Sequence, residues 1–253
     1  MSAADYAHIF THRGHSYHLA MQRWPDARRQ ELMAVLAPLL PLIQRLDGMR
    51  LMDVPAGGGY LAPYLPSTVE YTAYDPSPGF DDSPSSVMAA GLHALPFQSA
   101  QFDAVVSLAG LHHCADKTAF FEECHRLTNP QGIMVLMDVA EASAEASFLD
   151  DFIGHHNGMG HSGDYFSPLL PNLLQRAGWQ VVSDQQVVCD WRFASVGDLA
   201  GFCRQLFDIQ SASNEQIVNA VSEYLGGSQP DNESTFAAVM PWSLQRVVCR
   251  KLP

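Results

Sequence analysis

The first half of the chain is constrained most by its succession of short apolar runs, each followed by a helical stretch or a loop. The runs lie at residues 49–54, 70–74, 87–90, 102–108 and 133–139. Strands that are short and apolar throughout are typical of a parallel sheet covered by helices on both faces. This half of the sequence therefore predicts a doubly wound α/β fold.

The second half continues the sheet in a different order. It predicts a helix at 168–177, a strand at 179–188, a helical insert at 195–225 and a last strand near 244–250. Together the two halves predict a mostly parallel, seven-stranded, Rossmann-like sheet with an N-terminal helical lid and a helical insert before the last strand. We expect one domain, 1–253, with the lid at 1–45, a cofactor-binding half at 46–140, and a substrate-side half at 141–253 whose insert spans about 190–235.

The charge balance limits the partners that the chain can bind. Asp and Glu number 27 against 14 Lys and Arg, which gives a formal net charge of −13. Neutralising the phosphates of a nucleic acid requires clustered Lys and Arg, so neither nucleic acid nor an anionic membrane surface is expected as a partner. No apolar run approaches the roughly 18 residues needed to cross a bilayer. The sequence does not indicate an oligomeric state.

The five cysteines predict neither a disulfide framework nor a zinc site of the cysteine type. They are odd in number, lie far apart, and include no CxxC pair. Such residues are typically buried free thiols. Because the N-terminus also has no apolar core of a signal peptide, we expect a cytoplasmic protein.

A triple glycine follows the first predicted strand directly. Gly57, Gly58 and Gly59 stand before a short helical stretch, and Asp75 ends the next strand 18 residues after Gly57. Glycine allows a backbone to approach a ligand closely, and an acid at this distance accepts hydrogen bonds from ribose hydroxyls. The pattern indicates a nucleotide-like ligand, although a tight turn capped by Asp75 is the alternative.

The identity of that ligand is open from the loop alone. Gly57-x-Gly59-x-x-Ala62 satisfies the dinucleotide pattern G-x-G-x-x-G/A. An oxidoreductase that uses a nicotinamide dinucleotide is therefore one hypothesis. Asp53 opposes it, because a carboxylate there repels a pyrophosphate and attracts an ammonium group.

Several further segments resemble the class I S-adenosylmethionine-dependent methyltransferases, in particular the type 11 group. The resemblance covers residues 45–140 well and the remainder only in layout. Its motifs are Leu51-Met52-Asp53-Val54-Pro55-Ala56-Gly57-Gly58-Gly59, Tyr74-Asp75, Leu95-Pro96-Phe97, Phe102-Asp103-Ala104-Val105-Val106-Ser107, Leu111-His112-His113 and Leu127-Thr128-Asn129-Pro130-Gln131-Gly132.

The resemblance implies transfer of a methyl group from S-adenosylmethionine to a small-molecule acceptor. It implies that Asp53 faces the methionine amino group, that Asp75 holds the ribose diol, and that the loop approaches the cofactor. The implied cofactor-binding residues are Asp53, Pro55, Gly57, Gly59, Asp75, Leu95, Pro96 and Leu108. A non-catalytic nucleotide-binding protein is a further alternative.

Three departures from the family pattern affect the cofactor pocket. Pro55 stands where glycine is more usual, and only 15 residues separate Asp75 from Ala90. Gly91 aligns with the acid that often meets the adenine amino group. They predict a more open pocket.

The N-terminal segment carries four histidines at helical spacing. His8, His12, His15 and His18 recur at i, i+4, i+7 and i+10, and we expect Gly14 to interrupt the helix. The stripe is compatible with a metal site, a half-buried face, or a lid with Tyr6, Phe10, Arg13 and Tyr17. We favour the lid, expect no metal, and take Tyr17 and His18 as substrate-binding candidates.

Two later segments supply candidates for chemistry. His112 and His113 follow the fourth strand at the carboxyl edge of the sheet, where such folds keep their active sites. Residues 155–166 are expected to form a polar loop that carries His161 and Tyr165. We take His112, His113 and His161 as catalytic candidates, because imidazole titrates near neutral pH, and Tyr165 as a substrate contact. A packing role is the alternative.

Overall fold

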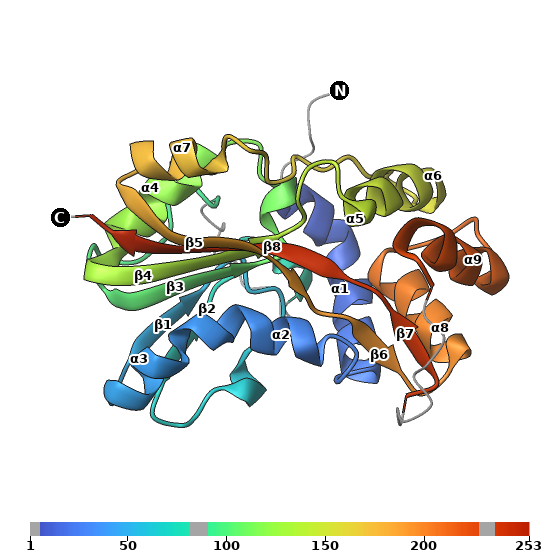
Figure 1. The fold of residues 1–253 in the computed structure, drawn as a ribbon, viewed down its shortest axis with the longest axis horizontal. Coiled ribbons are helices and arrows are strands. Elements are labelled where there is room, and N and C mark those ends of the chain that lie inside the picture. The colour runs from blue at the N-terminus through green and yellow to red at the C-terminus, as the bar shows by residue number, and fades with distance from the viewer. Residues whose placement is uncertain (1–5, 81–90, 228–235, 253) are drawn as a thin grey trace.

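A computed structural model describes residues 6–80, 91–227 and 236–252, and its centre is a six-stranded sheet (Figure 1). The strand order is β2-β1-β3-β4-β8-β5. The strands are β1 (Arg50–Asp53), β2 (Glu70–Ala73), β3 (Phe102–Leu108), β4 (Thr128–Asp138), β5 (Trp179–Val188) and β8 (Ser243–Lys251). Only β8 runs against its neighbours, β4 and β5, so the mostly parallel sheet is confirmed among the described residues.

Six of the seven predicted strands are confirmed, and the seventh, 87–90, lies outside the described residues. The segment Leu127-Thr128-Asn129-Pro130-Gln131-Gly132 lies at the irregular start of β4. The register with β3 shifts there between Phe102 and Ala104. Gln131 takes a φ of 65° there, so the bend is absorbed within the strand rather than before it.

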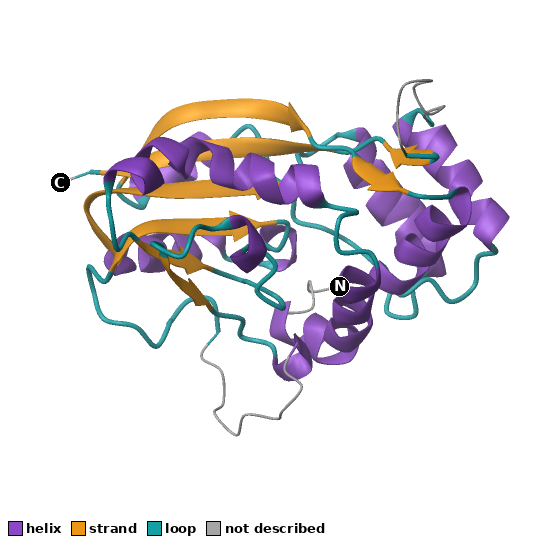
Figure 2. Cartoon of the chain, turned by 90° about the horizontal axis from the view of Figure 1, so that it is seen from below, coloured by secondary structure: helices purple, strands orange, loops and turns teal. Residues whose placement is uncertain are grey.

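Helices cover both faces of this sheet (Figures 1 and 2). On one face lie α2 (Arg29–Leu36) and α3 (Leu40–Arg45), and on the other lie α4 (Lys117–Leu127) and α7 (Leu170–Arg176). A 3-10 turn at Ala37–Leu39, which contains Pro38, separates α2 from α3. Asp116 begins α4 by accepting a hydrogen bond from the backbone of Ala119.

The segment after β4 is helical for longer than the sequence predicted. Ala144–Ser147 (α5), a π-helical turn at Phe148–Ile153 and Gly154–His156 (α6) follow one another without a break. His155 and His156 therefore end a helix, and the predicted polar loop begins only after them. The Ser143 side chain caps this segment, a signal that the sequence analysis passed over.

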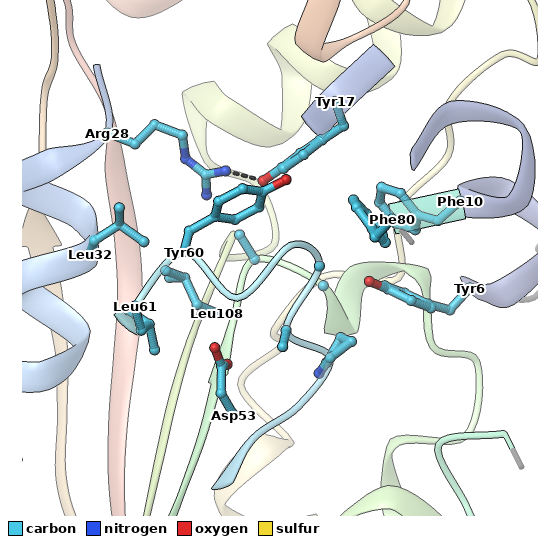
Figure 3. A pocket seen from close by; sticks show the side chains of 15 residues that line it. Tyr6, Phe10, Tyr17, Arg28, Leu32, Asp53, Tyr60, Leu61, Phe80 and Leu108 are labelled. Atoms are coloured by element: carbon cyan, nitrogen blue, oxygen red, sulfur yellow. Dashed lines mark hydrogen bonds between the residues drawn. The ribbon is translucent and has the colours of Figure 1, made fainter. Parts of the chain in front are cut away.

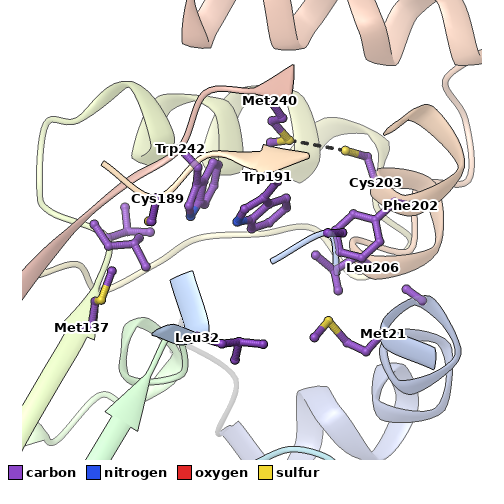
Figure 4. Packing of buried hydrophobic residues seen from close by; sticks show 14 of the residues in the cluster. Met21, Leu32, Met137, Cys189, Trp191, Phe202, Cys203, Leu206, Met240 and Trp242 are labelled. Atoms are coloured by element: carbon purple, nitrogen blue, oxygen red, sulfur yellow. Dashed lines mark hydrogen bonds between the residues drawn. The ribbon is translucent and has the colours of Figure 1, made fainter. Parts of the chain in front are cut away.

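The predicted helical insert is confirmed as α8 (Val196–Leu206) and α9 (Asn214–Leu225). The sequence did not predict the small antiparallel sheet beside it, formed by β6 (Trp191–Phe193) and β7 (Ala238–Met240). Trp191 and Trp242 pack against Phe202 and the side chains of α8 in a buried cluster (Figure 4). The insert is thus anchored by aromatic packing on the strands that lead back into β8.

The N-terminal helix α1 (Tyr6–Arg23) lies between the sheet and the insert (Figure 1). It runs through Gly14, so the expected interruption is wrong. A Cβ atom on Gly14 would lie 2.6 Å from the carbonyl carbon of Gly79, which explains why glycine stands there. The helix rests on the 3-10 turn Pro78–Phe80 by direct backbone contact. Among the described residues, no helix combines the length and the apolarity required to cross a bilayer.

This contact generates a prediction for Gly79→Ala. Its Cβ would lie 1.9 Å from the carbonyl oxygen of Phe10, and two backbones cannot separate without moving α1. We expect a loss of about 1–3 kcal/mol in the free energy of unfolding, measured by urea denaturation. Gly197→Ala is the control, because its Cβ meets only Ser195 Oγ at 3.6 Å. Equal stability of the two variants would contradict the proposed packing.

Candidate functional site

A cavity opens where β1 and β2 end, beneath α1 (Figure 3). Parallel strands bring their carboxyl ends to one edge of the sheet, which is where ligands bind in such folds. Side chains from α1, α2, the glycine loop and the end of β3 form its walls. The lining residues are Tyr6, Phe10, Tyr17, Arg28, Leu32, Asp53, Pro55, Ala56, Gly57, Tyr60, Leu61, Phe80, Leu108, Ala109 and Gly110.

Asp53, the last residue of β1, is the charged group at the base of this cavity. It is 3% exposed, accepts a hydrogen bond from Tyr71 Oη at 2.6 Å, and forms no ion pair with a described residue. Burial raises the pKa of Asp53 to about 7, against the opposing effect of the Tyr71 hydrogen bond. A cation bound beside it would favour the carboxylate. Sequence reasoning missed Tyr71, which faces Asp53 only because β2 pairs with β1.

Asp75 joins the glycine loop to the N-terminal helix. Its Oδ2 accepts hydrogen bonds from the Gly57 amide and from Tyr6 Oη, both at 2.7 Å, while Oδ1 accepts one from the Ser77 amide at 2.8 Å. Gly57 has a φ of 54°, in the left-handed region that a residue with a Cβ atom seldom adopts. The loop therefore presents backbone rather than side chain to the cavity.

A second cavity adjoins the first. The two share Phe10, Tyr17, Arg28 and Ala109 in their walls. The walls of the second cavity combine aromatic side chains with basic ones. Its remaining lining residues are Arg13, His112, His113, Val139, Leu149, His161, Trp191, Leu206, Phe207 and Trp242.

Three histidines predicted from the sequence meet in this second cavity. His112 and His113 stand on a 3-10 turn after β3, and His161 comes from the loop after α6. One ring nitrogen of each lies within 4.8 Å of the others. Burial, with the neighbouring histidines, lowers the pKa of His113 well below its usual value, and burial also lowers that of His161. Both rings are therefore neutral at pH 7.

Two carboxylates orient these rings from behind. Asp138, at the end of β4, lies 2.7 Å from His112 Nδ1 and also accepts hydrogen bonds from the Leu111, His112 and Val139 amides. Asp150 lies 3.0 Å from His161 Nδ1 and accepts a hydrogen bond from Tyr165 Oη. Burial raises the pKa of both acids, but the neighbouring histidines and the hydrogen bonds outweigh it and leave the pKa of each lowered. Neither acid was predicted, although Asp138 lies near the end of a predicted strand at the same edge.

Comparison with known proteins assigns the central part of the chain. Residues 52–136 match the methyltransferase domain family of type 11. This part of the chain is similar to a methyltransferase domain. The match contains β1, the glycine loop, Asp75 and the histidine turn, so the resemblance expected from these residues is confirmed.

Curated relatives match over part of their length. A tRNA U34 carboxymethyltransferase from Trichlorobacter lovleyi is 27% identical over 63% of this chain and 57% of its own. A ubiquinone biosynthesis O-methyltransferase from Methylocella silvestris is 32% identical over 35% of this chain and 39% of its own. The chain thus spans about half the length of the relatives that it matches.

Solved methyltransferase structures share the fold at low identity. A possible histamine N-methyltransferase from Thermotoga maritima has a TM-score of 0.58 and 16% identity, covering 96% of this chain and 99% of its own. A phosphoethanolamine N-methyltransferase from Haemonchus contortus, solved with S-adenosylhomocysteine, has a TM-score of 0.52 and 13% identity, covering 88% and 52%. The family's cofactor is S-adenosylmethionine.

Most of the residues expected to bind the methyltransferase cofactor lie around the first cavity. Asp53, Pro55, Gly57 and Leu108 line it, and Asp75 bonds to two of its lining residues. Gly59 lines a neighbouring surface hollow instead. Leu95 and Pro96 are absent from the lining. The Leu95 amide donates a hydrogen bond to Glu123, and residues 81–90 just before this segment lie outside the description.

The predicted substrate contacts are placed less uniformly. Tyr17 lines both cavities. His18 is absent from the linings of both and lies 3.0 Å from Tyr60 Oη through its Nδ1. Tyr165 stands behind the histidines, bonded to Asp150 and stacked on His112. Of the N-terminal stripe, His8 contacts only its neighbour His12 among the aromatic rings of the described residues.

The buried Asp53 carboxylate predicts a pH dependence of stability. In the folded protein the pKa of this acid is about 7, whereas in the unfolded chain it is about 3.8. The folded state thus binds the extra proton between these values, and stability falls as pH rises through them. Asp53→Asn removes this loss of stability. The free energy of unfolding of the variant should therefore rise relative to that of the wild-type protein from pH 5 to pH 8, to a difference on the order of 1–4 kcal/mol. Urea denaturation at each pH measures it, and a pH-independent difference would contradict the assignment.

Proposed function

We propose that the protein transfers a methyl group from S-adenosylmethionine, held in the first cavity, to a small-molecule acceptor held in the second. The observation that carries the proposal is the shared wall of the two cavities, formed by Phe10, Tyr17, Arg28 and Ala109. Methyl transfer needs donor and acceptor in line at short distance, and adjoining cavities supply that arrangement.

The first cavity fits the charges of this cofactor. Asp53 places a buried carboxyl where the methionine ammonium group would lie, and a cation there favours its ionised form. Asp75 offers carboxylate oxygens to the ribose hydroxyls from a position fixed by Gly57 and Ser77. A nicotinamide dinucleotide fits less well, because its pyrophosphate would approach Asp53.

The chain's own residues orient the acceptor and exclude water. The cofactor supplies an electrophilic methyl group bound to a sulfonium. Tyr6 and Phe10 of α1 cover the first cavity, while Trp191, Phe207 and Trp242 enclose the second. The histidine cluster supplies polar groups on one side of otherwise apolar walls. Such a cavity suits an aromatic or apolar acceptor with one polar reacting group.

A small molecule fits this cavity better than a nucleic acid. The second cavity is lined by buried aromatic side chains, and the chain as a whole has a net charge of −13. Electrostatic repulsion opposes the approach of a phosphate backbone to such a protein. The five cysteines are buried and free, which fits a reducing compartment, and we place the protein in the cytoplasm.

Cofactor binding tests this proposal. S-adenosylmethionine and S-adenosylhomocysteine should each raise the melting temperature, whereas NAD should not. Asp75→Asn removes the carboxylate that is assigned to the ribose and should weaken binding of S-adenosylhomocysteine at least tenfold, measured by calorimetry.

Asp184→Asn is the matched control, because this exposed acid on β5 bonds only to Gln245 at the far side of the sheet. It should bind S-adenosylhomocysteine like the wild-type protein. Stabilisation by NAD alone, or unchanged affinity in Asp75→Asn, would overturn the assignment.

A further inference from the structure

We propose that His112, His113 and His161 bind one divalent transition-metal ion, with zinc the best match, in the wall of the second cavity. The inference deepens the proposed function and rests on it only for the placement of the acceptor. The sequence analysis expected no metal. What changes this expectation is the convergence of three rings from two distant segments, with one nitrogen of each within 4.8 Å of the others.

The carboxylates behind two of the rings decide which nitrogen faces the cavity. Asp138 accepts hydrogen bonds from three backbone amides and is an acceptor only, so His112 Nδ1 must carry the proton that it shares with Asp138. His112 Nε2 therefore bears a lone pair. Asp150 orients His161 in the same way, with Gly163 and Tyr165 as its other donors. Carboxylate–histidine pairs of this kind orient the ligands of most protein metal sites.

His113 leaves its ring open to the second cavity. The side chain lines this cavity, is 7% exposed, and forms no side-chain hydrogen bond with a described residue. Its ring packs edge-on against Phe10 and His161. A ligand in the cavity can therefore reach the imidazole without displacing a protein partner.

The spacing of the nitrogens agrees with a site that closes around its ion. With zinc–nitrogen bonds of about 2.0–2.1 Å, tetrahedral ligands lie roughly 3.4 Å apart. The three nitrogens lie within 4.8 Å of one another, so the rings must move slightly inward to reach this spacing. The rings of His112 and His161 are held by Asp138 and Asp150, whereas the His113 ring forms no side-chain hydrogen bond with a described residue.

Two of the three cations near the cluster are paired with acids. Lys117 pairs with Asp164 at 2.8 Å, and Arg28 pairs with Glu31. Arg13 lines the same cavity and donates a hydrogen bond to the Leu206 carbonyl, but forms no ion pair with a described residue.

Asp138 and Asp150 have only the imidazoles of His112 and His161 as ionic partners among the described residues. An ion bound to His112 and His161 would lie on the side of each imidazole that faces away from its carboxylate.

Three histidines leave one coordination position for the acceptor, as in catalytic zinc sites. The class of acceptor that this predicts is a hydroxyl compound. A bound metal lowers the pKa of a ligated hydroxyl, which releases its proton to solvent at neutral pH. The oxygen electron pair then forms the bond to the methyl carbon, and the carbon–sulfur bond breaks with its electrons on sulfur. The products are a methyl ether and S-adenosylhomocysteine.

Metal titration tests the site in the whole protein. After treatment with a chelator, the wild-type protein should bind one equivalent of Zn²⁺ by calorimetry, and Co²⁺ should produce the visible absorption of a tetrahedral site. His113→Gln and His161→Gln should each weaken binding at least tenfold, and Asp150→Asn about 10–100-fold through His161. His155→Gln is the control, because this exposed histidine ends α6 outside the cavity.

The outcomes separate this proposal from the proposed function. Each variant's fold is checked through the melting temperature shift with S-adenosylhomocysteine, which the metal site does not touch. If the wild-type protein binds that ligand but takes up no Zn²⁺ below about 100 µM, the metal site is wrong and the methyltransferase assignment stands. Equal loss of metal in His155→Gln and His161→Gln would also overturn the site. Zinc binding without binding of S-adenosylhomocysteine would leave the site and remove the proposed reaction.

Discussion

Both cavities depend on one buried ion pair, that of Arg28 with Glu31. Glu31 is fully buried and accepts hydrogen bonds from Arg28 and from Trp191 Nε1, while Arg28 also donates to Tyr17 Oη (Figure 3). The contacts therefore join α1, α2 and β6, three elements that are distant in sequence. Removing one member of such a pair leaves an unpaired buried charge and costs about 3–5 kcal/mol.

The same ion pair keeps the Arg28 cation beside the proposed reaction site. Because Arg28 is paired with Glu31, it does not pair with Asp53. Burial lowers the pKa of Arg28, but the Glu31 carboxylate more than offsets this and leaves the pKa raised. Arg28 and Tyr17 form part of the wall between the two cavities. Arg28 therefore forms part of the wall between the proposed donor and acceptor sites. Asp53 stays available for a cationic ligand.

The sequence was informative where function depends on position along a strand. The carboxyl ends of predicted strands carry Asp53, Asp75 and the pair His112–His113. Parallel pairing brings these ends to one edge of the sheet, independently of the side chains elsewhere. His161 was identified from its loop. The sequence could not show that its ring would meet the other two, because that contact depends on how the helical segment 144–156 returns the chain to the sheet.

The unpredicted residues share a different cause, since each acts through a long-range contact. Tyr71 reaches Asp53 by strand pairing, and Trp242 enters the second cavity by packing on Trp191. Gly14 was expected to break a helix, yet its lack of a Cβ serves a contact with Gly79, 65 residues further along the chain. The intrinsic secondary-structure propensity of a residue does not depend on contacts with residues distant in sequence.

The acids of the two cavities are held in opposite ways, and this explains their different chemistry. Asp138 is surrounded by amide donors that keep it ionised and directed at His112. Asp53 has one hydroxyl donor, so burial holds its pKa near 7 and its charge depends on the occupant of the cavity. A cofactor that carries both an ammonium and a sulfonium stabilises the carboxylate most strongly. In the proposed reaction the sulfonium charge is lost on methyl transfer, so Asp53 would attract the product less strongly than the substrate.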